Sequence, residues 1–502
     1  MTNILSLPEQ LTQILESLTA LSPEVLLSAS FLLMILIDLF LYQDLKNSKQ
    51  FVKNPSQSHQ VILAICLVSL VIALNQTVQL FYSTSNVFLF GKMLVLDSKA
   101  ILFKFLIILS AIFVLFHVYV TKKDFVAEFY PLLIGMVVGL CLMAMSVNLL
   151  MIYLSIEIVS VSSYMLTAID KSRKSTEAGL KYVLFGAASS AVMLYGMSLL
   201  YGMTGTLDIA SPDFSRGIAQ IDSVASTIAI ILTISGFLFK ISAAPFHIWT
   251  PDVYESAPTP VVAFFSVAPK IAGFLVAMRF YSAVPNNLQN ITAVLAMASI
   301  TFGNFSALWQ NNAKRLLAYS TVAHSGFMLI GLVTMSQLGL TSIVFYLVVT
   351  LFTNLAAFLL IDYSEEIKTP EHQISKIEHL KGLGRLNPFY GVMVLIVMIS
   401  LAGLPPTAGF FAKLNIFSAL WESYQTTSQP ILLWLFIFGL LNTAVALFFY
   451  LKIPFFMFFK EPLENQVFEL NAKQYFWGII LVLPILILFF KADWLMEIIS
   501  FL

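Results

Sequence analysis

Residues 232–249 read LTISGFLFKISAAPFHIW, an apolar run with Lys240 near its middle and Pro245 and His247 shortly after it. A charge at the centre of a membrane helix costs about 2.5–3.5 kcal/mol on insertion scales. Proline removes a backbone donor and clashes with the preceding turn of a helix. Non-helical backbone survives in a membrane only when it is buried in protein or lines water. The stretch therefore predicts a broken membrane helix with a buried cation beside the break.

The composition agrees with a membrane location. Of the 502 residues, 59% are hydrophobic and only 11% are charged, which lies far outside the range of soluble proteins and indicates a polytopic membrane protein. The formal net charge is zero, and no nucleic-acid partner is expected. Cys66 and Cys141 lie in apolar runs without CxxC spacing, so we interpret them as packing residues. No metal, haem, iron-sulfur or phosphate-loop motif occurs, so no cofactor is expected in this chain.

Apolar stretches of about 20 residues, the length that crosses a bilayer, predict an all-α fold of about fourteen transmembrane helices. No cleavage signature precedes the first stretch, so we expect it to be retained. The predicted spans are residues 23–42, 61–82, 98–120, 126–146, 148–169, 176–201, 224–248, 259–281, 288–308, 316–334, 338–361, 387–420 (interrupted), 429–459 and 474–495.

The positions of the 27 Lys and Arg residues predict the orientation. Connections after odd-numbered spans hold sixteen of them, and connections after even-numbered spans, with the C-terminal end, hold five. Positive residues favour the cytoplasmic side of a membrane. Odd-numbered connections are therefore predicted to face the cytoplasm, with both termini on the outer side.

Six lysines fall inside the predicted spans. Lys104 and Lys452 lie close to span ends, and we interpret them as lysines whose long side chains extend to the membrane surface. Lys181 lies about six residues into its span, so its side chain could either extend to the surface or be buried in the protein. The central ones include Lys240 and Lys270, and Glu157 is equally central.

A buried lysine is more readily neutral and a buried carboxyl more readily protonated, whereas contact between them favours both charged forms. A central Glu–Lys pair thus has two competing states, as a proton relay requires. A static buried ion pair is the alternative.

The helix breaks suggest an internal repeat. Pro405 and Pro406 interrupt the span that carries Lys413, just as Pro245 follows Lys240. Broken helices with central charges, one in each half of a chain, are typical of inverted repeats around an ion path. We predict an N-terminal three-helix segment over 1–124, a first five-helix half over 125–283, an inverted second half over 284–460, and a C-terminal helix over 461–502.

Histidine can carry protons near neutral pH. His324 lies mid-span among Ser and Thr residues, and packing is the alternative interpretation. His247, Pro245, Pro405 and Pro406 are candidate gating residues at the breaks, although His247 could equally cap a helix. The other histidines are expected to be solvated at span ends or in loops: His59, His117, His372 and His379.

Several of these motifs occur together in one known family. The segments APFHIWTPDVYESAPTPVVAFF, SVAPKIAGF, NAKRLLAYSTVAHSGFML and LAGLPPTAGFFAKL, with Glu157 and Lys181 before them, cover nearly the whole chain. Their order resembles the antiporter-like subunits of proton-pumping NADH:quinone oxidoreductase, respiratory complex I, and most of all the N-type (mitochondrial subunit 2) members. The M-type members usually have Glu where Lys413 stands.

The resemblance implies roles for individual residues. Glu157 and Lys240 would be the paired switch of a first half-channel, with Lys181 as a modulator. Lys270 would bridge to the second half, His324 would be the central relay, and Lys413 would be the terminal lysine.

The resemblance also implies a setting. NADH, FMN, iron-sulfur clusters and quinone would belong to partner chains, and other membrane-arm subunits and lipid would surround this chain. The location would be a bacterial inner membrane with both termini periplasmic. A subunit of a multisubunit cation/proton antiporter and a structural membrane subunit with static ion pairs remain as alternatives.

Overall fold

The computed structural model describes residues 7–47, 55–83, 86–284, 288–365, 376–462 and 468–500. The N-terminal half contains α1 (Leu7–Ala20), α2 (Ser22–Asn47), α3 (Pro55–Ser83), α4 (Ser98–Thr121), α5 (Phe129–Met145), α6 (Leu149–Thr167), α7 (Arg173–Thr204), α8 (Pro212–Ala219), α9 (Ser223–Lys240), α10 (Trp249–Ser256) and α11 (Thr259–Ala283). The remainder contains α12 (Gln289–Leu308), α13 (Ala313–Thr334), α14 (Gln337–Glu365), a 3-10 turn (Ile377–Leu380), α15 (Leu383–Leu386), α16 (Pro388–Ala402), α17 (Ala408–Thr427), α18 (Pro430–Phe459), α19 (Ala472–Phe490) and α20 (Ala492–Ser500).

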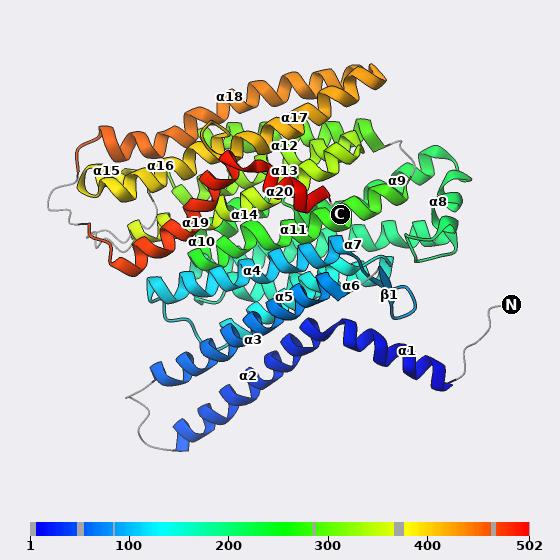
Figure 1. The fold of residues 1–502 in the computed structure, drawn as a ribbon, viewed down its shortest axis with the longest axis horizontal. Helices are drawn as coiled ribbons and strands as arrows, with labels where there is room; N and C mark the ends of the chain where they lie inside the picture. The colour runs from blue at the N-terminus through cyan, green and yellow to red at the C-terminus, as the bar shows by residue number, and fades with distance from the viewer. Residues whose placement is uncertain are drawn as a thin grey trace.

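The long helices lie side by side in one bundle (Figure 1). Within the described ranges, twelve helices are long and apolar enough to cross a membrane, and α5 and α16 are shorter apolar helices. The chain is therefore a multi-pass helical membrane protein, as predicted. The count of fourteen spans and the inverted repeat stay predictions.

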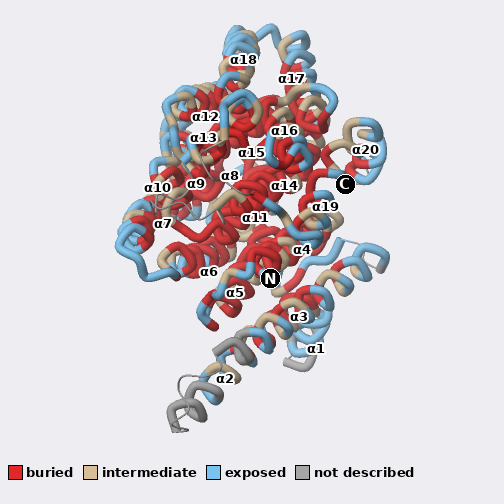
Figure 2. The backbone as a smooth tube through the Cα atoms, turned by 90° about the vertical axis from the view of Figure 1, so that its left-hand side faces the viewer, coloured by how far each residue is buried: buried red, intermediate tan, exposed pale blue. Residues whose placement is uncertain are grey.

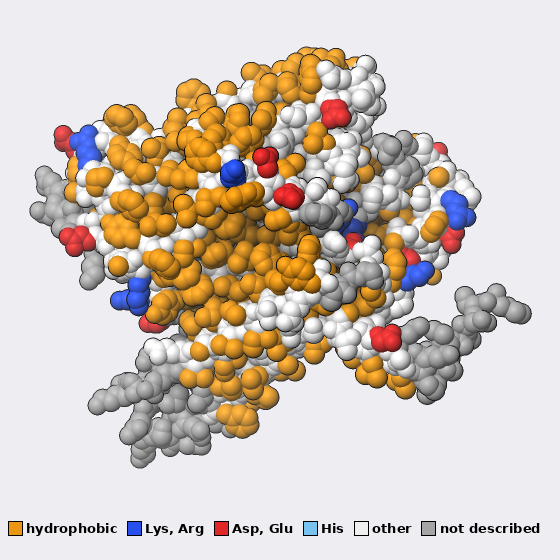
Figure 3. Space-filling view, in the orientation of Figure 1, with side chains coloured by type: hydrophobic (Ala, Val, Ile, Leu, Met, Phe, Trp, Pro, Cys, Tyr) orange, Lys and Arg blue, Asp and Glu red, His pale blue; other side chains and the backbone are white. Residues whose placement is uncertain are grey.

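Burial sorts these helices into an inner and an outer group. The apolar window of α11 is 100% buried, whereas that of α18 is 28% buried. Figure 2 shows the buried positions gathered on α11, α13 and α14, with α2 and α18 at the exposed margins. In the space-filling view, hydrophobic side chains cover much of the surface (Figure 3). Large apolar patches on a protein mark contact with lipid or with other chains.

Polar residues mark where several helices begin. The Asp97 side chain accepts a hydrogen bond from the amide of Ala100 at the start of α4, and Asn148 and Ser172 do the same for α6 and α7. Asn148 also separates α6 from α5, so the chain ends one helix and starts the next within three residues. The predicted joint at residues 146–148 is confirmed.

Some elements depart from an all-α description or lie outside the predicted spans. Strands β1 (Val87–Leu89) and β2 (Leu94–Leu96) form an antiparallel hairpin before α4. Helices α1, α8 and α20 are short elements beside the predicted spans. The strands, α8 and α20 have three to nine residues and carry too little periodicity to be read from sequence. Helix α1 has 14 residues, which is too short to be counted as a span.

Both predicted breaks occur. Helix α9 ends at Lys240, non-helical backbone follows through residues 241–248, and α10 then begins. Helix α16 ends at Ala402 and is capped by Gly403, whose φ of +83° is the left-handed conformation that suits glycine. A Cβ at this position would also lie 3.1 Å from Cε of Lys413. Gly403 therefore both ends the helix and leaves room for the lysine.

Two cavities lie at opposite ends of α11. The larger, about 840 Å³, adjoins Thr259 and is lined by the connections that follow α4, α6, α10, α12 and α14. We call it the polar cavity, and its charged lining residues are Lys123, Asp124, Asp170, Lys174, Glu255, Lys314, Glu365 and Lys376. The smaller, about 240 Å³, adjoins Tyr281 and Val284. The connections after predicted spans three, five, seven, nine and eleven thus meet on one face, which the sequence predicts to be cytoplasmic.

Candidate functional site

The first buried lysine closes the first half-helix of the break. Lys240 is the last residue of α9, is 2% exposed, and donates from Nζ to Oγ of Ser160 on α6 at 2.9 Å. The end of a helix favours a cation because its last carbonyls point there. The sequence placed Lys240 at the centre of a span, and the structure places it at the helix end created by the break.

Glu157 lies one turn before Ser160 on the same helix. Its Oε1 atom is buried without a hydrogen-bond partner among the described residues, and no ion pair joins Glu157 to Lys240 there. Ser160 donates its own proton to the carbonyl of Ile156 at 2.7 Å. Ser160 therefore contacts the lysine while its own proton is held by the helix backbone, and it can pass a proton only by turning its hydroxyl.

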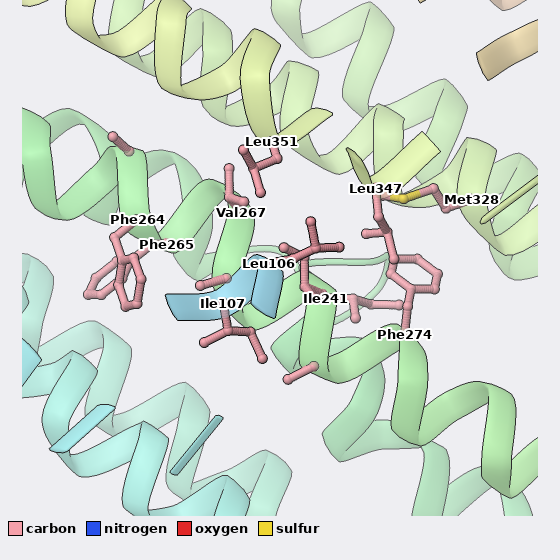
Figure 4. Close-up of a cluster of buried hydrophobic side chains, with 14 of the residues drawn as sticks. Leu106, Ile107, Ile241, Phe264, Phe265, Val267, Phe274, Met328, Leu347 and Leu351 are labelled. Atoms are coloured by element: carbon pink, nitrogen blue, oxygen red, sulfur yellow. The ribbon is translucent and has the colours of Figure 1, made fainter. Parts of the chain in front are cut away.

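Lys270 connects the first half of the chain to α13. It follows Pro269 inside the fully buried helix α11, and Nζ donates to the carbonyl of Thr321 at 2.5 Å. One turn further along α13, Ser325 donates to the carbonyl of Ile241 in the break at 2.5 Å. Ile241 also packs close to Phe274, Met328 and Leu347 (Figure 4). Helix α13 thus contacts both the break and Lys270.

His324 has partners on both sides of its ring. Nδ1 lies 2.7 Å from the hydroxyl of Tyr346 on α14, and Nε2 lies 3.0 Å from the hydroxyl of Tyr450 on α18. Tyr450 is also hydrogen-bonded to Ser320. An imidazole between two hydroxyls can accept a proton on one nitrogen and release one from the other. The sequence singled out His324 and missed both tyrosines.

Lys413 lies at the second break. Its Nζ donates to the carbonyl of Ala402, the last residue of α16, at 2.7 Å, and lies 4.8 Å from the centre of the Phe327 ring. A helix end and an aromatic face both favour a cation. Each break therefore holds a buried lysine against the end of the helix that it interrupts.

The proline and histidine candidates for gating lie within or beside the breaks. Pro245 is exposed in the first break, and Pro405 and Pro406 are exposed in the second. The ring of His247 stacks on Phe302 with a centroid distance of 6.0 Å. A gating role for these residues stays a prediction.

Lys181 lies apart from the buried lysines. Its side chain is 42% exposed, and its Nζ is 3.0 Å from Asp252 on α10 and 3.1 Å from Glu177. Asp252 also binds Arg315 of α13 at 2.8 Å. Burial opposes the charge of Asp252, but the hydrogen bonds from Lys181 and Arg315 outweigh it and lower the pKa of this carboxyl. Asp252 thus fastens α10, the helix beyond the break, to α7 and α13.

Replacing Asp252 with Asn should loosen α10. We expect the melting temperature of the purified complex to fall by about 1–3 °C, since partly exposed ion pairs contribute little. A carboxyl with a lowered pKa stabilises the fold above its unfolded pKa, and this contribution is lost as pH falls through the folded pKa. The difference between Asp252→Asn and wild type should therefore vanish at acid pH. Glu177→Gln, which removes only an exposed partner of Lys181, should leave the melting curve unchanged.

Two interpretations of charged residues were wrong. Lys104 does not reach a surface: its side chain is 0% exposed and Nζ lies 2.7 Å from Glu24 of α2. His117 is buried, with Nε2 2.7 Å from Asp362 of α14. Lys314 lies in the first turn of α13, where it is buried, donates to the carbonyl of Ala257 and lines the polar cavity.

The missed partners have a common signal. Glu24 and Asp362 are carboxylates at the ends of apolar stretches, where sequence alone suggests contact with water. Buried charges are paired as a rule. A second charge of opposite sign at the matching depth of another span is therefore the signal that could have found them.

The remaining residues considered in the sequence are the two cysteines, Lys452 and two histidines. Cys66 and Cys141 are buried and free, as packing residues should be. Lys452 donates from Nζ to the carbonyl of Gln310 at a helix end. Within the described ranges, no group of three His, Cys, Asp or Glu residues could hold a metal ion. The side chains of His59 and His372 lie outside the described residues.

Buried cations on interrupted helices, connected to hydroxyl groups and a histidine, define the chain as a polytopic membrane protein with groups that can carry protons. Residues 146–443 match the family described as NADH:quinone oxidoreductase/Mrp antiporter, TM. The chain belongs to this family.

Relatives and solved structures support this assignment. The NADH-quinone oxidoreductase subunit N 2 of Chloroherpeton thalassium is 37% identical over 473 residues, covering 90% of this chain and 88% of that protein. A chain of respiratory complex I from Thermus thermophilus, solved with bound aureothin, superposes with a TM-score of 0.78 at 28% identity, covering 95% of this chain and 98% of that chain. A chain of the Mrp complex from Dietzia shares the fold, with a TM-score of 0.82 at 20% identity over 97% of this chain and 96% of that chain.

Proposed function

We propose that this chain is the N-type membrane subunit of a proton-translocating NADH:quinone oxidoreductase. The observation that carries the proposal is the placement of one buried lysine at each helix break, Lys240 and Lys413, with Lys270 and His324 on the inner helices between them. The family assignment and the subunit N relatives support it.

In this function the chain moves protons and leaves redox chemistry to its partners. Other membrane-arm subunits would adjoin it, and partner chains would hold FMN and iron-sulfur clusters and bind NADH and quinone. Moving one charge against a potential of 100 mV requires about 2.3 kcal/mol, so the energy must come from the redox reaction. The membrane would be a bacterial inner membrane, with both termini on the periplasmic side.

The residues suggest how protons would move. Glu157 and Lys240, with the Ser160 hydroxyl next to the lysine, would exchange a proton in the first half, with Lys181 modulating the pair from α7. Lys270 would carry charge toward α13, where the two tyrosine hydroxyls let His324 accept and release protons. Lys413 would hold the proton before release. The halves over 125–283 and 284–460 would be inverted repeats around this row.

The complex that contains this chain tests the function directly. Reconstituted in vesicles, it should take up protons when NADH and quinone are added, and uptake should stop when electron transfer is inhibited. An imposed sodium gradient without NADH should move no protons. Proton movement that follows the sodium gradient and ignores NADH would instead identify a cation/proton antiporter subunit, a class whose fold this chain shares.

A further inference from the structure

A second set of buried titratable groups lies between α4 and α14. Asp362, with its side chain 0% exposed, binds Nε2 of His117 at 2.7 Å through one oxygen and Nζ of Lys123 at 2.5 Å through the other. We call these three residues the α4–α14 triad. None of its three residues belongs to the proposed proton path through Lys240, Lys270 and Lys413.

The triad adjoins the polar cavity through Lys123. The Lys123 side chain is 32% exposed and lines the cavity, whereas Asp362 and His117 lie behind it. When the Lys123 amine turns toward the cavity, it leaves one oxygen of Asp362 without its cation. Lys123 is thus placed to control access from the cavity to the carboxylate.

Charged groups face the triad from several neighbouring elements. Glu365 lies one turn beyond Asp362 on α14, Asp170 comes from the connection after α6, and Lys314 comes from α13. From α19, Lys473 contacts the hydroxyl of Tyr119 at 3.2 Å. Burial alone would lower the pKa of Lys123, but the carboxylates of Asp362 and Glu365 outweigh burial and raise it. Lys123 is therefore held in its charged form while it is paired with Asp362.

Asp170 adds a proton-collecting group at the cavity. Its side chain is exposed where it lines the cavity, and partial desolvation raises the pKa of its carboxyl against the opposing effect of Lys123 and Lys314. A carboxyl of this kind takes up protons more readily than a fully solvated one. Cavity water and Asp170 together can deliver protons to the mouth of the triad.

We propose that His117 and Asp362 form a further proton-uptake site, loaded from the polar cavity and gated by Lys123. A proton from cavity water would bind the neutral imidazole of His117, and the resulting imidazolium would be held by the Asp362 carboxylate. Lys123 competes for the same carboxylate, so its return would favour release of the proton. Further along α14, Asn354, Thr350 and Tyr346 are buried polar residues at four-residue spacing, and the hydroxyl of Tyr346 contacts His324.

The test compares three variants of the whole complex. Asp362→Asn removes the carboxylate and His117→Gln removes the imidazole. Asp97→Asn is the matched control. Like Asp362, Asp97 is an aspartate paired with a cation, since it lies 2.7 Å from Arg279. It lies at the start of α4 and does not line the polar cavity. NADH-driven quinone reduction and proton uptake are measured from about pH 6 to about pH 9, which covers the upper part of the histidine titration range and the alkaline limb beyond it.

We expect both site variants to lose activity at alkaline pH, where protons are scarce and an uptake site matters most. The alkaline limb should shift by about one pH unit toward acid, a tenfold loss at a fixed alkaline pH. Asp97→Asn should follow the wild-type profile. Superimposable profiles for all variants would overturn the proposal, as would an equal shift in Asp97→Asn, which would indicate a general structural effect.

His117→Gln keeps the proposal testable if Asp362→Asn does not assemble, since it leaves the Lys123–Asp362 pair intact. The proposal rests on the proposed proton-translocating function, and the two can fail separately. Wild-type complex that takes up no protons with NADH would contradict the function. Normal uptake in the wild type with unchanged pH profiles in the variants would contradict only the uptake site.

Discussion

Replacing Lys240 with Ala should abolish most NADH-driven proton uptake while the complex still assembles. The lysine is buried at the end of α9, and its Nζ bonds only to Oγ of Ser160 among the hydrogen bonds of the described residues. Ser160 keeps its own bond to Ile156 when the lysine is removed, so no buried donor is stranded. The loss should therefore affect proton transfer more than folding.

The expected size of the effect follows from the role. Groups that transfer protons typically contribute about 10²–10⁴-fold to a rate, so uptake should fall at least about tenfold. Quinone reduction should fall with it, because redox chemistry coupled to pumping slows when the pump is blocked. The measurements are dye-reported proton uptake and NADH oxidation in vesicles, after a native gel has confirmed assembly.

Lys452→Ala is the matched control. This lysine also lies in an apolar helix, but its Nζ reaches backbone and side-chain oxygens at the connection after α12. Its removal should leave uptake near the wild-type rate. If Lys240→Ala assembles and pumps normally, Lys240 is not a proton carrier and the static interpretation holds.

The location of the breaks could be predicted because proline acts locally. Pro245 and Pro405 interrupt apolar stretches, and a missing amide donor has the same consequence in any fold. The joint between α5 and α6 was likewise placed correctly. Which apolar helices face lipid could not be predicted, because α11 and α18 are both apolar on all sides and differ only in their neighbours.

The site was partly predictable for a similar reason. A lysine in a long apolar stretch is costly wherever it lies, so Lys240 and Lys270 were evident from sequence. Their partners were not, because partners belong to other helices. His117 binds a residue 245 positions away, and no periodicity specifies that α4 lies beside α14. The position of Lys104 near a span end was also misleading, since the lysine is buried against Glu24 in the first turn of α2.

The largest effect on stability is expected for Glu24→Gln. Lys104 is fully buried and Nζ lies 2.7 Å from Glu24, with the sulfur of Met145 as a further contact at 3.8 Å. Breaking a buried pair leaves an uncompensated charge and costs about 3–5 kcal/mol. We expect a clear fall in the melting temperature of the purified complex and less assembled complex on a native gel.

A double variant separates the charge from the packing. Replacing both Glu24 and Lys104 with Leu removes both charges, and apolar replacements of buried pairs are often neutral or stabilising. The double variant should therefore be more stable than Glu24→Gln and should pump at the wild-type rate, since this pair lies outside the proposed path. Asp213→Asn, which breaks an exposed pair with Arg216 at 3.5 Å, should change neither property. If Glu24→Gln melts like wild type, the pair contributes no stability. If the double variant assembles but fails to pump, Glu24 and Lys104 belong to the proton path, and the interpretation of this pair as a static ion pair is wrong.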